Sequence, residues 1–214
     1  GQTIAPERDT LGSTQDGWYL RELAKKMGYG DVPVTATTEW IGRMVEGGRP
    51  HGLREQAEWK VRDGLLALAY GYDTISIAGI NDASDAYYYS IWANGGLNYR
   101  YPAMAPKPAY AAIATLTQVL DKAKFVRFIP TGSTVCYLAE FQRGDDWIYA
   151  LWTPRDEREL QLTFNDAASR TLTDLYGRNT NVTGKNVALQ ASTAAQYLVS
   201  KTKLIGASVG KSTF

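Results

Sequence analysis

The sequence has almost none of the residues that build disulfides, zinc sites or histidine-dependent active sites. Cys136 is the only cysteine and His51 the only histidine among 214 residues. One cysteine forms no intramolecular disulfide and no multi-cysteine zinc site. A Ser-His-Asp or Cys-His mechanism would have to use His51, which stands in the polar stretch GGRPHG. We therefore expect no bound metal, no other cofactor and no histidine-based nucleophilic mechanism.

The sequence also lacks a long apolar run and an excess of charge. Its longest nearly apolar stretch covers residues 64–71, whereas a helix that spans a bilayer needs about 20 apolar residues. The opening residues GQTIAPERDT show no basic head followed by an apolar run, so we expect no signal peptide in this sequence. Lysine and arginine total 23 against 22 for aspartate and glutamate, a net charge of +1. Because so weak a field attracts neither phosphate backbones nor anionic lipid, we expect no membrane span and no nucleic-acid partner.

What the sequence does contain is 44% hydrophobic and 12% aromatic residues, enough for a sizeable globular core. In the first part, helical periodicity and β-branched runs predict helices over residues 16–27, 53–70 and 109–122 and buried strands over 32–40 and 74–80. This order is typical of β/α units with parallel strands. Two parallel strands neither close a barrel nor bury both faces of a sheet. Residues 1–124 therefore need partners supplied from elsewhere.

The second part has short alternating runs separated by turn signals such as TGS, RGDD and YGRN. Such spacing is typical of an antiparallel β-sandwich, which we predict over residues 125–200. The last stretch, KTKLIGASVGKSTF, is polar and glycine-bearing, and predicts a tail or linker over 201–214. The predicted strands cover residues 125–130, 134–142, 147–153, 159–164, 169–175, 186–189 and 195–199.

Glu39 is the sharpest candidate for catalysis, because it follows a buried strand and precedes Trp40. Enzymes with α/β barrels present their catalytic groups at the carboxyl ends of the strands. A carboxylate held there beside an aromatic wall suits attack on the anomeric carbon of a sugar. The alternative is a solvated or salt-bridged glutamate at the end of a strand.

Candidates for substrate binding follow the second predicted strand. Asp82 and Asp85 stand at the same end as Glu39, although a sequence such as NDASD more often forms a turn whose carboxylates bond their own backbone. The next residues are rich in aromatic rings, amides and a guanidinium, which together suit the apolar faces and hydroxyls of sugars. In the alternative, these rings plug the bottom of the neighbouring sheet or seal the contact between the domains. The predicted binding residues are Trp40, Asn81, Asp82, Tyr87, Trp92, Asn94 and Arg100.

Several strings, taken in order, resemble a known group of enzymes. VTATTEW, GLREQAEWKVRDGLLALAYGYD and NGGLNYRYPAMAPKPAYAAIATLTQVLD resemble the last two β/α units of TIM-barrel retaining glycoside hydrolases, in the clan with catalytic glutamates on strands 4 and 7. AEFQRGDDWIYALWTP and TLTDLYGRNTNV resemble the small β-sandwich that follows many of these barrels. The fold class implied is α/β plus all-β: strands 7 and 8 of a (β/α)8 barrel with flanking helices, followed by an antiparallel β-sandwich.

The resemblance implies a role for Glu39 as the strand 7 nucleophile, with the acid/base glutamate supplied by a missing N-terminal part. The aromatic residue that commonly follows strand 8 has no counterpart in IAGIND, and Trp92 is its possible substitute. We therefore expect the C-terminal portion of a hydrolase that cleaves O-glycosidic bonds in poly- or oligosaccharides outside the cell or in the cell envelope, inactive as this chain alone. Its partner is the remaining barrel half, from the same precursor or another chain. The alternative is a non-catalytic carbohydrate-binding or cell-surface structural or assembly protein with a remnant barrel.

Overall fold

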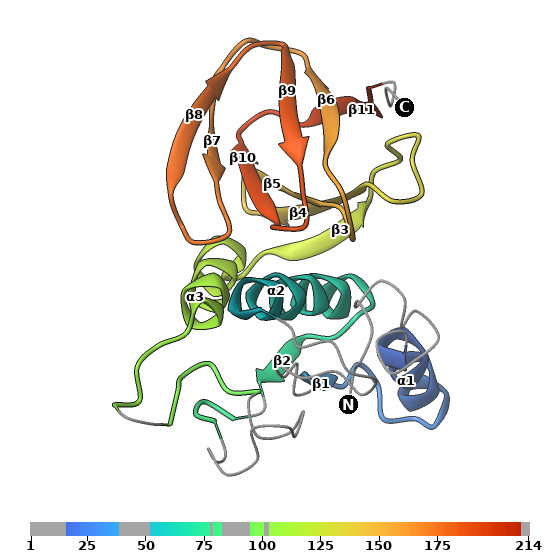
Figure 1. The fold of residues 1–214 in the computed structure, drawn as a ribbon. Helices are drawn as coiled ribbons and strands as arrows, with labels where there is room; N and C mark the ends of the chain where they lie inside the picture. The colour runs from blue at the N-terminus through green and yellow to red at the C-terminus, as the bar shows by residue number, and fades with distance from the viewer. Residues whose placement is uncertain (1–15, 39–51, 78, 83–94, 101–102, 211–214) are drawn as a thin grey trace. The chain divides into compact units, whose positions relative to one another are not determined.

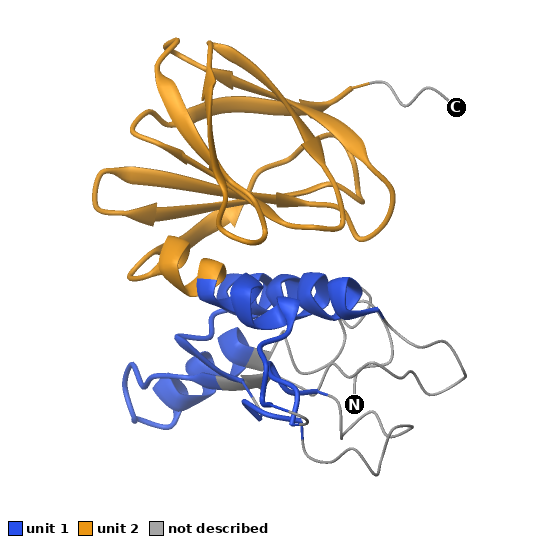
Figure 2. Ribbon diagram, turned by 60° about the vertical axis from the view of Figure 1, so that its left-hand side comes forward, with its two compact units in different colours: residues 1–114 blue, residues 115–214 orange. Residues whose placement is uncertain are grey.

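The computed structural model describes residues 16–38, 52–77, 79–82, 95–100 and 103–210. The chain divides into two compact units, residues 1–114 and 115–214 (Figure 2). This division lies inside a helix, somewhat before the boundary near residue 124 that the change in sequence style predicts. No helix in the described ranges is both long enough and apolar enough to cross a membrane.

The first unit contains the helix and strand order that periodicity predicts (Figure 1). The two strands pair in parallel, from Thr35 opposite Thr74 to Thr38 opposite Ile77, as expected of a β/α unit. A small core of Val34, Ala67, Tyr72 and Ile75 lies between the helix and the strands it connects. Its elements are α1 (Asp16–Lys26), β1 (Thr35–Thr38), α2 (Leu53–Ala69), β2 (Thr74–Ile77) and α3 (Pro108–Leu120), the last of which continues into the second unit.

Asp73 sets the register of the two parallel strands. Its carboxylate oxygen Oδ2 accepts a hydrogen bond from the backbone N–H of Val34 at 2.8 Å, and its own N–H donates to the Val34 carbonyl at 2.9 Å. Gly71, with φ of 93°, allows the sharp turn between α2 and β2. The two strands therefore start in register, and they also end in register, with Thr38 opposite Ile77.

The second unit consists of antiparallel sheets around one core. Six strands pair in the order β3-β4-β5-β10-β7-β8 and three in the order β11-β6-β9. Leucines from both sheets, including Leu138, Leu151, Leu162 and Leu189, meet in the core. The strands are β3 (Lys124–Phe128), β4 (Tyr137–Arg143), β5 (Asp146–Trp152), β6 (Arg158–Phe164), β7 (Ser169–Thr173), β8 (Asn179–Thr183), β9 (Asn186–Ala191), β10 (Gln196–Ser200) and β11 (Leu204–Val209).

The expectation of a tail or linker over residues 201–214 is wrong for Leu204–Val209. These residues form β11, which pairs with β6 and brings Leu204 into the core. The backbone N–H of Leu204 donates to the Tyr149 hydroxyl at 2.7 Å. Only one strongly apolar pair, Leu204 and Ile205, marks this strand in a polar stretch, which is why the alternation is hard to see. The polar strand β8 was missed for the same reason.

The single cysteine lies in the core of the second unit. Cys136 is buried, and burial raises the pKa of its thiol to about 11. Because only the thiolate is a good nucleophile, this side chain is unreactive near neutral pH.

Candidate functional site

The carboxyl ends of β1 and β2 mark the place where the sequence predicts a site. Thr38 and Ile77, the last residues of the two strands, lie opposite each other. Glu39 comes directly after Thr38 in the chain. Five predicted residues lie outside the described residues, whereas Asn81, Asp82 and Arg100 lie within them. The five are Glu39, Trp40, Tyr87, Trp92 and Asn94.

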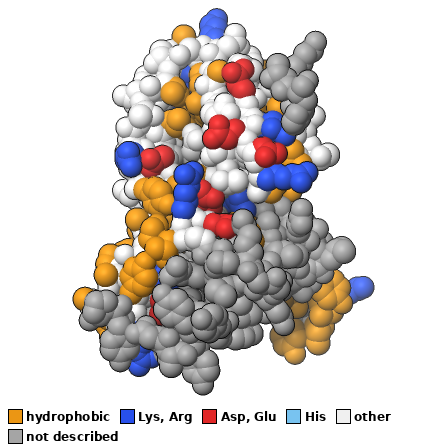
Figure 3. Space-filling view, viewed as in Figure 1, with side chains coloured by type: hydrophobic (Ala, Val, Ile, Leu, Met, Phe, Trp, Pro, Cys, Tyr) orange, Lys and Arg blue, Asp and Glu red, His pale blue; other side chains and the backbone are white. Residues whose placement is uncertain are grey.

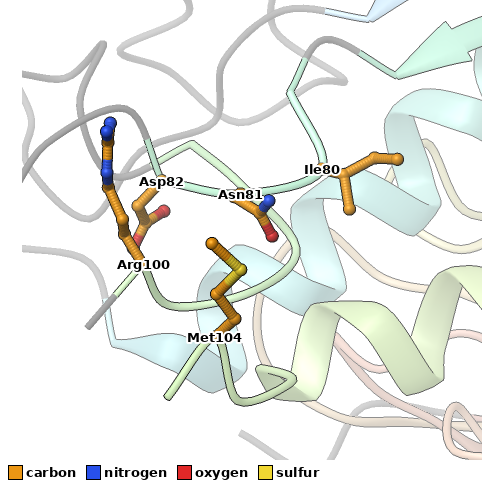
Figure 4. Close-up of a pocket in the computed structure, with 5 residues that line it drawn as sticks. All are labelled: Ile80, Asn81, Asp82, Arg100 and Met104. Carbon is orange, nitrogen blue, oxygen red and sulfur yellow. The ribbon is translucent and has the colours of Figure 1, made fainter. Parts of the chain in front are cut away.

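A pocket of about 460 Å³ follows β2 (Figure 4). Its lining comes from residues 80–82 and from Arg100 and Met104, so the structure brings Asn81, Asp82 and Arg100 together. Ile80 and Met104 complete the lining and were not predicted. The volume is within the range of small-molecule sites. Amide, carboxylate and guanidinium groups beside two apolar side chains can bind a polar ligand that also has an apolar face.

Backbone hydrogen bonds hold three chain segments together behind this pocket. Asn81 pairs in parallel with Asn98, which pairs in antiparallel with Pro106. The N–H groups of Leu97 and Asn98 both donate to the Ile80 carbonyl, at 2.9 and 2.8 Å. The Asn98 side-chain amide donates to Asn81 Oδ1 at 3.1 Å, which fixes the Asn81 side chain.

Gly96 allows the close approach of these segments. A Cβ at this position would lie 2.4 Å from the carbonyl carbon of Asn81 and 2.5 Å from the Asp82 nitrogen. No residue with a side chain fits there without moving the backbone beneath the pocket. The Gly96 N–H, in turn, donates to Asp82 Oδ1 at 3.1 Å.

Asp82 is held by a buried ion pair. Lys107 Nζ donates to Asp82 Oδ1 at 2.5 Å, and the two side chains are 0% and 6% exposed. The same Nζ lies 5.4 Å from the centre of the Tyr99 ring. The partners of Asp82 are thus 14 and 25 residues away in sequence, so the interpretation of this residue as a local turn is wrong. Both bonds use Oδ1, and Oδ2 is the oxygen suited to accept a ligand hydroxyl.

A second buried lysine lies near this ion pair. Lys60 on α2 is only 2% exposed, and in the part of the chain that the structure describes its Nζ has no hydrogen-bond partner. Burial lowers the pKa of Lys60 to about 8, with the neighbouring charge of Lys107 adding to the decrease and the carboxylates of Asp63 and Asp82 opposing it. The charged amine is therefore destabilising at neutral pH.

Replacing Lys60 by methionine is expected to stabilise the protein. A fall from 10.5 in the unfolded chain to about 8 in the folded one corresponds to a cost of about 3 kcal/mol for charging this amine. The cost is fully present below pH 8 and disappears as pH rises toward 10.5. Urea unfolding should show a gain of roughly that size in Lys60→Met near pH 7, and a smaller gain near pH 10.

The matched control is Lys25→Met, since Lys25 is on the exposed surface of α1. Its free energy of unfolding should change by less than about 0.5 kcal/mol at either pH. A loss of stability in Lys60→Met near pH 7 would show that the amine makes a favourable contact.

Metal ligands do not gather among the described residues of this site. Across residues 16–38, 52–77, 79–82, 95–100 and 103–210, no three His, Cys, Asp or Glu side chains are placed to hold a metal ion.

Comparison with known proteins finds similarity in structure alone. No protein-family model matches the sequence, and no curated protein matches it. A family 39 glycoside hydrolase from the gut symbiont Bacteroides cellulosilyticus WH2 is similar with a TM-score of 0.68 and 20% identity, over 85% of this chain and 37% of that one. A family 30 endoxylanase from Clostridium papyrosolvens C71 has a TM-score of 0.54 and 12% identity, over 87% and 46%. A family 30 subfamily 8 xylanase from Clostridium acetobutylicum has a TM-score of 0.56 and 9% identity, over 83% and 44%.

These structural neighbours are glycoside hydrolases, and the chain shares the fold of the part that it matches. It spans less than half the length of each of them.

Five residues of the site were not predicted from the sequence. Their roles arise only through contacts with distant parts of the chain: Ile80, Met104, Gly96, Lys107 and Lys60. Lys107 stands in the string PKPAY, whose resemblance to known enzymes concerns a helix rather than a binding site. The only available signal was the charge of Lys107 beside the predicted start of that helix.

Proposed function

We propose that this chain is the C-terminal part of a retaining glycoside hydrolase, in which β1 and β2 are the seventh and eighth strands of a (β/α)8 barrel and the second unit is the β-sandwich that follows it. The observation that carries the proposal is the level, parallel ending of β1 and β2 next to the pocket. In barrel enzymes the chemistry takes place at this end of the strands. The similarity in fold to a family 39 glycoside hydrolase supports the same assignment.

Glu39 is the nucleophile in this proposal. Its carboxylate attacks the anomeric carbon and forms a glycosyl ester, while a glutamate from the remainder of the barrel protonates the leaving oxygen. That second residue then removes a proton from the water that hydrolyses the ester. The 214-residue chain by itself holds one member of the catalytic pair and is expected to be inactive.

The pocket residues bind the sugar. Asn81 and Arg100 donate hydrogen bonds to hydroxyls, and Asp82 Oδ2 accepts one. Trp92 is proposed as the aromatic floor of the subsite, with Trp40, Tyr87 and Asn94 completing it. The ion pair with Lys107 holds the Asp82 carboxylate in one orientation, which lowers the ordering cost of binding.

The substrate in this proposal is a poly- or oligosaccharide outside the cytoplasm. Two of the similar structures are described as xylanases, so xylan is the first polysaccharide to test. Another, from Bacteroides fragilis, is described as a conserved exported protein, with a TM-score of 0.53 and 9% identity. It supports a location outside the cell or in the cell envelope.

The test is the stereochemistry of hydrolysis by the complete protein, that is, this chain together with the rest of its barrel. Proton NMR of the first product from xylan, or from an aryl glycoside panel, should show the same anomeric configuration as the substrate. An inverted product would exclude a glycosyl ester on Glu39. Binding of oligosaccharide without any hydrolysis would favour the carbohydrate-binding alternative.

A further inference from the structure

Helix α1 is attached to its own unit by side-chain hydrogen bonds from Arg21 and Trp18. The Arg21 guanidinium donates to Asp73 Oδ2 at 2.7 Å, to the Gly71 carbonyl at 2.9 Å and to Asp31 Oδ1 at 3.0 Å. Trp18 Nε1 donates to the Ala69 carbonyl at 3.2 Å. The contacts that hold α1 against the α2–β2 turn are thus mostly hydrogen bonds and ion pairs.

Two glycines bring α1 close to this turn. A Cβ on Gly17 would lie 2.6 Å from the Tyr70 carbonyl oxygen, and one on Gly71 would lie 2.7 Å from the Trp18 ring. The helix therefore has little freedom to rotate about its axis. Apart from Arg21 and Ala24, the side chains from Trp18 to Met27 are exposed.

One exposed face of α1 is apolar. We call it the α1 stripe: Tyr19, Leu20, Leu23 and Met27. Their spacings of three, four and seven or eight residues place them along one side of a helix. Tyr19 and Met27 are 66% and 62% exposed, and the two leucines are also exposed. Figure 3 shows hydrophobic side chains gathered at the lower right, where Figure 1 places α1. An ordinary amphipathic helix buries such a face, whereas here the attached side is the one that carries Gly17, Trp18 and Arg21.

Strand β1, which follows α1, has one edge to which no other described strand is bonded. In the described ranges β1 pairs with β2 alone, along the other edge. Parallel sheets of two strands are not stable by themselves, and an open edge presents unpaired N–H and C=O groups. A helix that leads into a parallel strand normally comes from a neighbouring strand by a right-handed crossover. The strand before α1 would therefore lie on this edge of β1.

We propose that the α1 stripe and the free edge of β1 together form one docking surface for a preceding β/α segment. Its strand pairs in parallel with Thr35–Thr38, and an apolar helix face of the same barrel part covers Tyr19, Leu20, Leu23 and Met27. The inference rests on the proposed function, because that function requires the remainder of a barrel. The 63% of the family 39 structure that this chain does not cover, 100 − 37, leaves ample length for such a segment. Docking on β1 also brings the partner's strand ends to the end at which Glu39 follows Thr38.

The test compares the double variant Leu23→Glu/Met27→Glu in the 214-residue chain and in the complete protein. In the chain alone the melting temperature should not change, because both side chains already face solvent. In the complete protein it should fall by about 5 °C or more, because two carboxylates would be buried in an apolar contact. The matched control is Val126→Glu/Ile205→Glu, two exposed apolar residues of the second unit, which should leave the melting temperature unchanged in both settings.

Amide hydrogen exchange on the unaltered protein gives a second measurement that needs no variant. Amides of Thr35–Thr38 that point to the free edge should exchange slowly in the complete protein and rapidly in the chain alone. Equal exchange in both, or no effect of Leu23→Glu/Met27→Glu in the complete protein, would overturn the proposal. The proposal would also be overturned if the 214-residue chain formed a dimer that Leu23→Glu/Met27→Glu dissociates, since a second copy would then cover the stripe.

None of these measurements requires sugar. If docking through the stripe is found in a protein that hydrolyses no glycoside, the proposed function fails and this inference stands. If hydrolysis is found without docking at the stripe, the proposed function stands and this inference fails.

Discussion

Glu39→Gln in the complete protein is expected to lower kcat by at least about 10³-fold while substrate binding is retained. The amide has nearly the shape of the carboxylate but carries no charge and is a poor nucleophile, so the glycosyl ester does not form. Turnover of an aryl glycoside and titration of an oligosaccharide onto the variant measure the two effects separately. The control is Glu22→Gln on the exposed side of α1, which should keep full turnover.

A smaller side chain at the same position allows the role of Glu39 to be tested by rescue. In Glu39→Gly, an added small anion such as azide or formate can enter the space of the lost carboxylate and attack the sugar from the same side. Azide should restore part of the turnover and yield a glycosyl azide of inverted configuration, because only one displacement then occurs. Full turnover in Glu39→Gln would refute the nucleophile assignment, whatever the result of rescue.

Lys107→Met is expected to destabilise the protein by about 3–5 kcal/mol, because it leaves the carboxylate of Asp82 buried without its cation. The N–H of Gly96 remains as the bond to Asp82 Oδ1. Chemical unfolding of the complete protein measures the loss directly. The first unit carries the pair, so fluorescence or exchange probes in residues 52–77 should report it most strongly.

The double variant Lys107→Met/Asp82→Asn separates the ion pair from simple packing. It should recover much of the stability, because no uncompensated charge is then buried. Lys25→Met, which removes only an exposed i,i+3 ion pair with Glu22, should cost less than about 0.5 kcal/mol. If Lys107→Met lowered the free energy of unfolding no more than Lys25→Met does, the charged form of Asp82 would not depend on Lys107. Retained oligosaccharide binding in the double variant would argue that Asp82 is a structural residue alone.

The order of helices and strands in the first unit could be predicted because periodicity and β-branched runs are local properties of the sequence. The burial of α2 could not. An amphipathic pattern places Glu58 and Arg62 on a polar side, yet both are buried, as are Lys60 and Asp63. A polar side chain is buried or exposed according to what packs over it, and the packing partner is not adjacent in sequence.

The candidate site, too, could be predicted from the sequence only in part. Asn81, Asp82 and Arg100 were predicted from their position after a strand and from their chemistry, and the pocket contains all three. Lys107 and Gly96 were missed because they act on Asp82 from segments 25 and 14 residues away. Glu39 remains a prediction, as do Trp40, Tyr87, Trp92 and Asn94. In the second unit, β8 and β11 were missed because polar strands are specified by their neighbours rather than by their own alternation.

The burial of Cys136 has a practical consequence for following events at the pocket. The chain contains one thiol, and that thiol is enclosed in the core of the second unit with its pKa raised to about 11. A maleimide fluorophore would therefore find almost no reactive sulfur in the folded protein. Met104→Cys, on the exposed wall of the pocket, would introduce the single site that such a dye labels. The molecule is thus ready for an optical reporter of ligand entry, with no need to remove its native cysteine first.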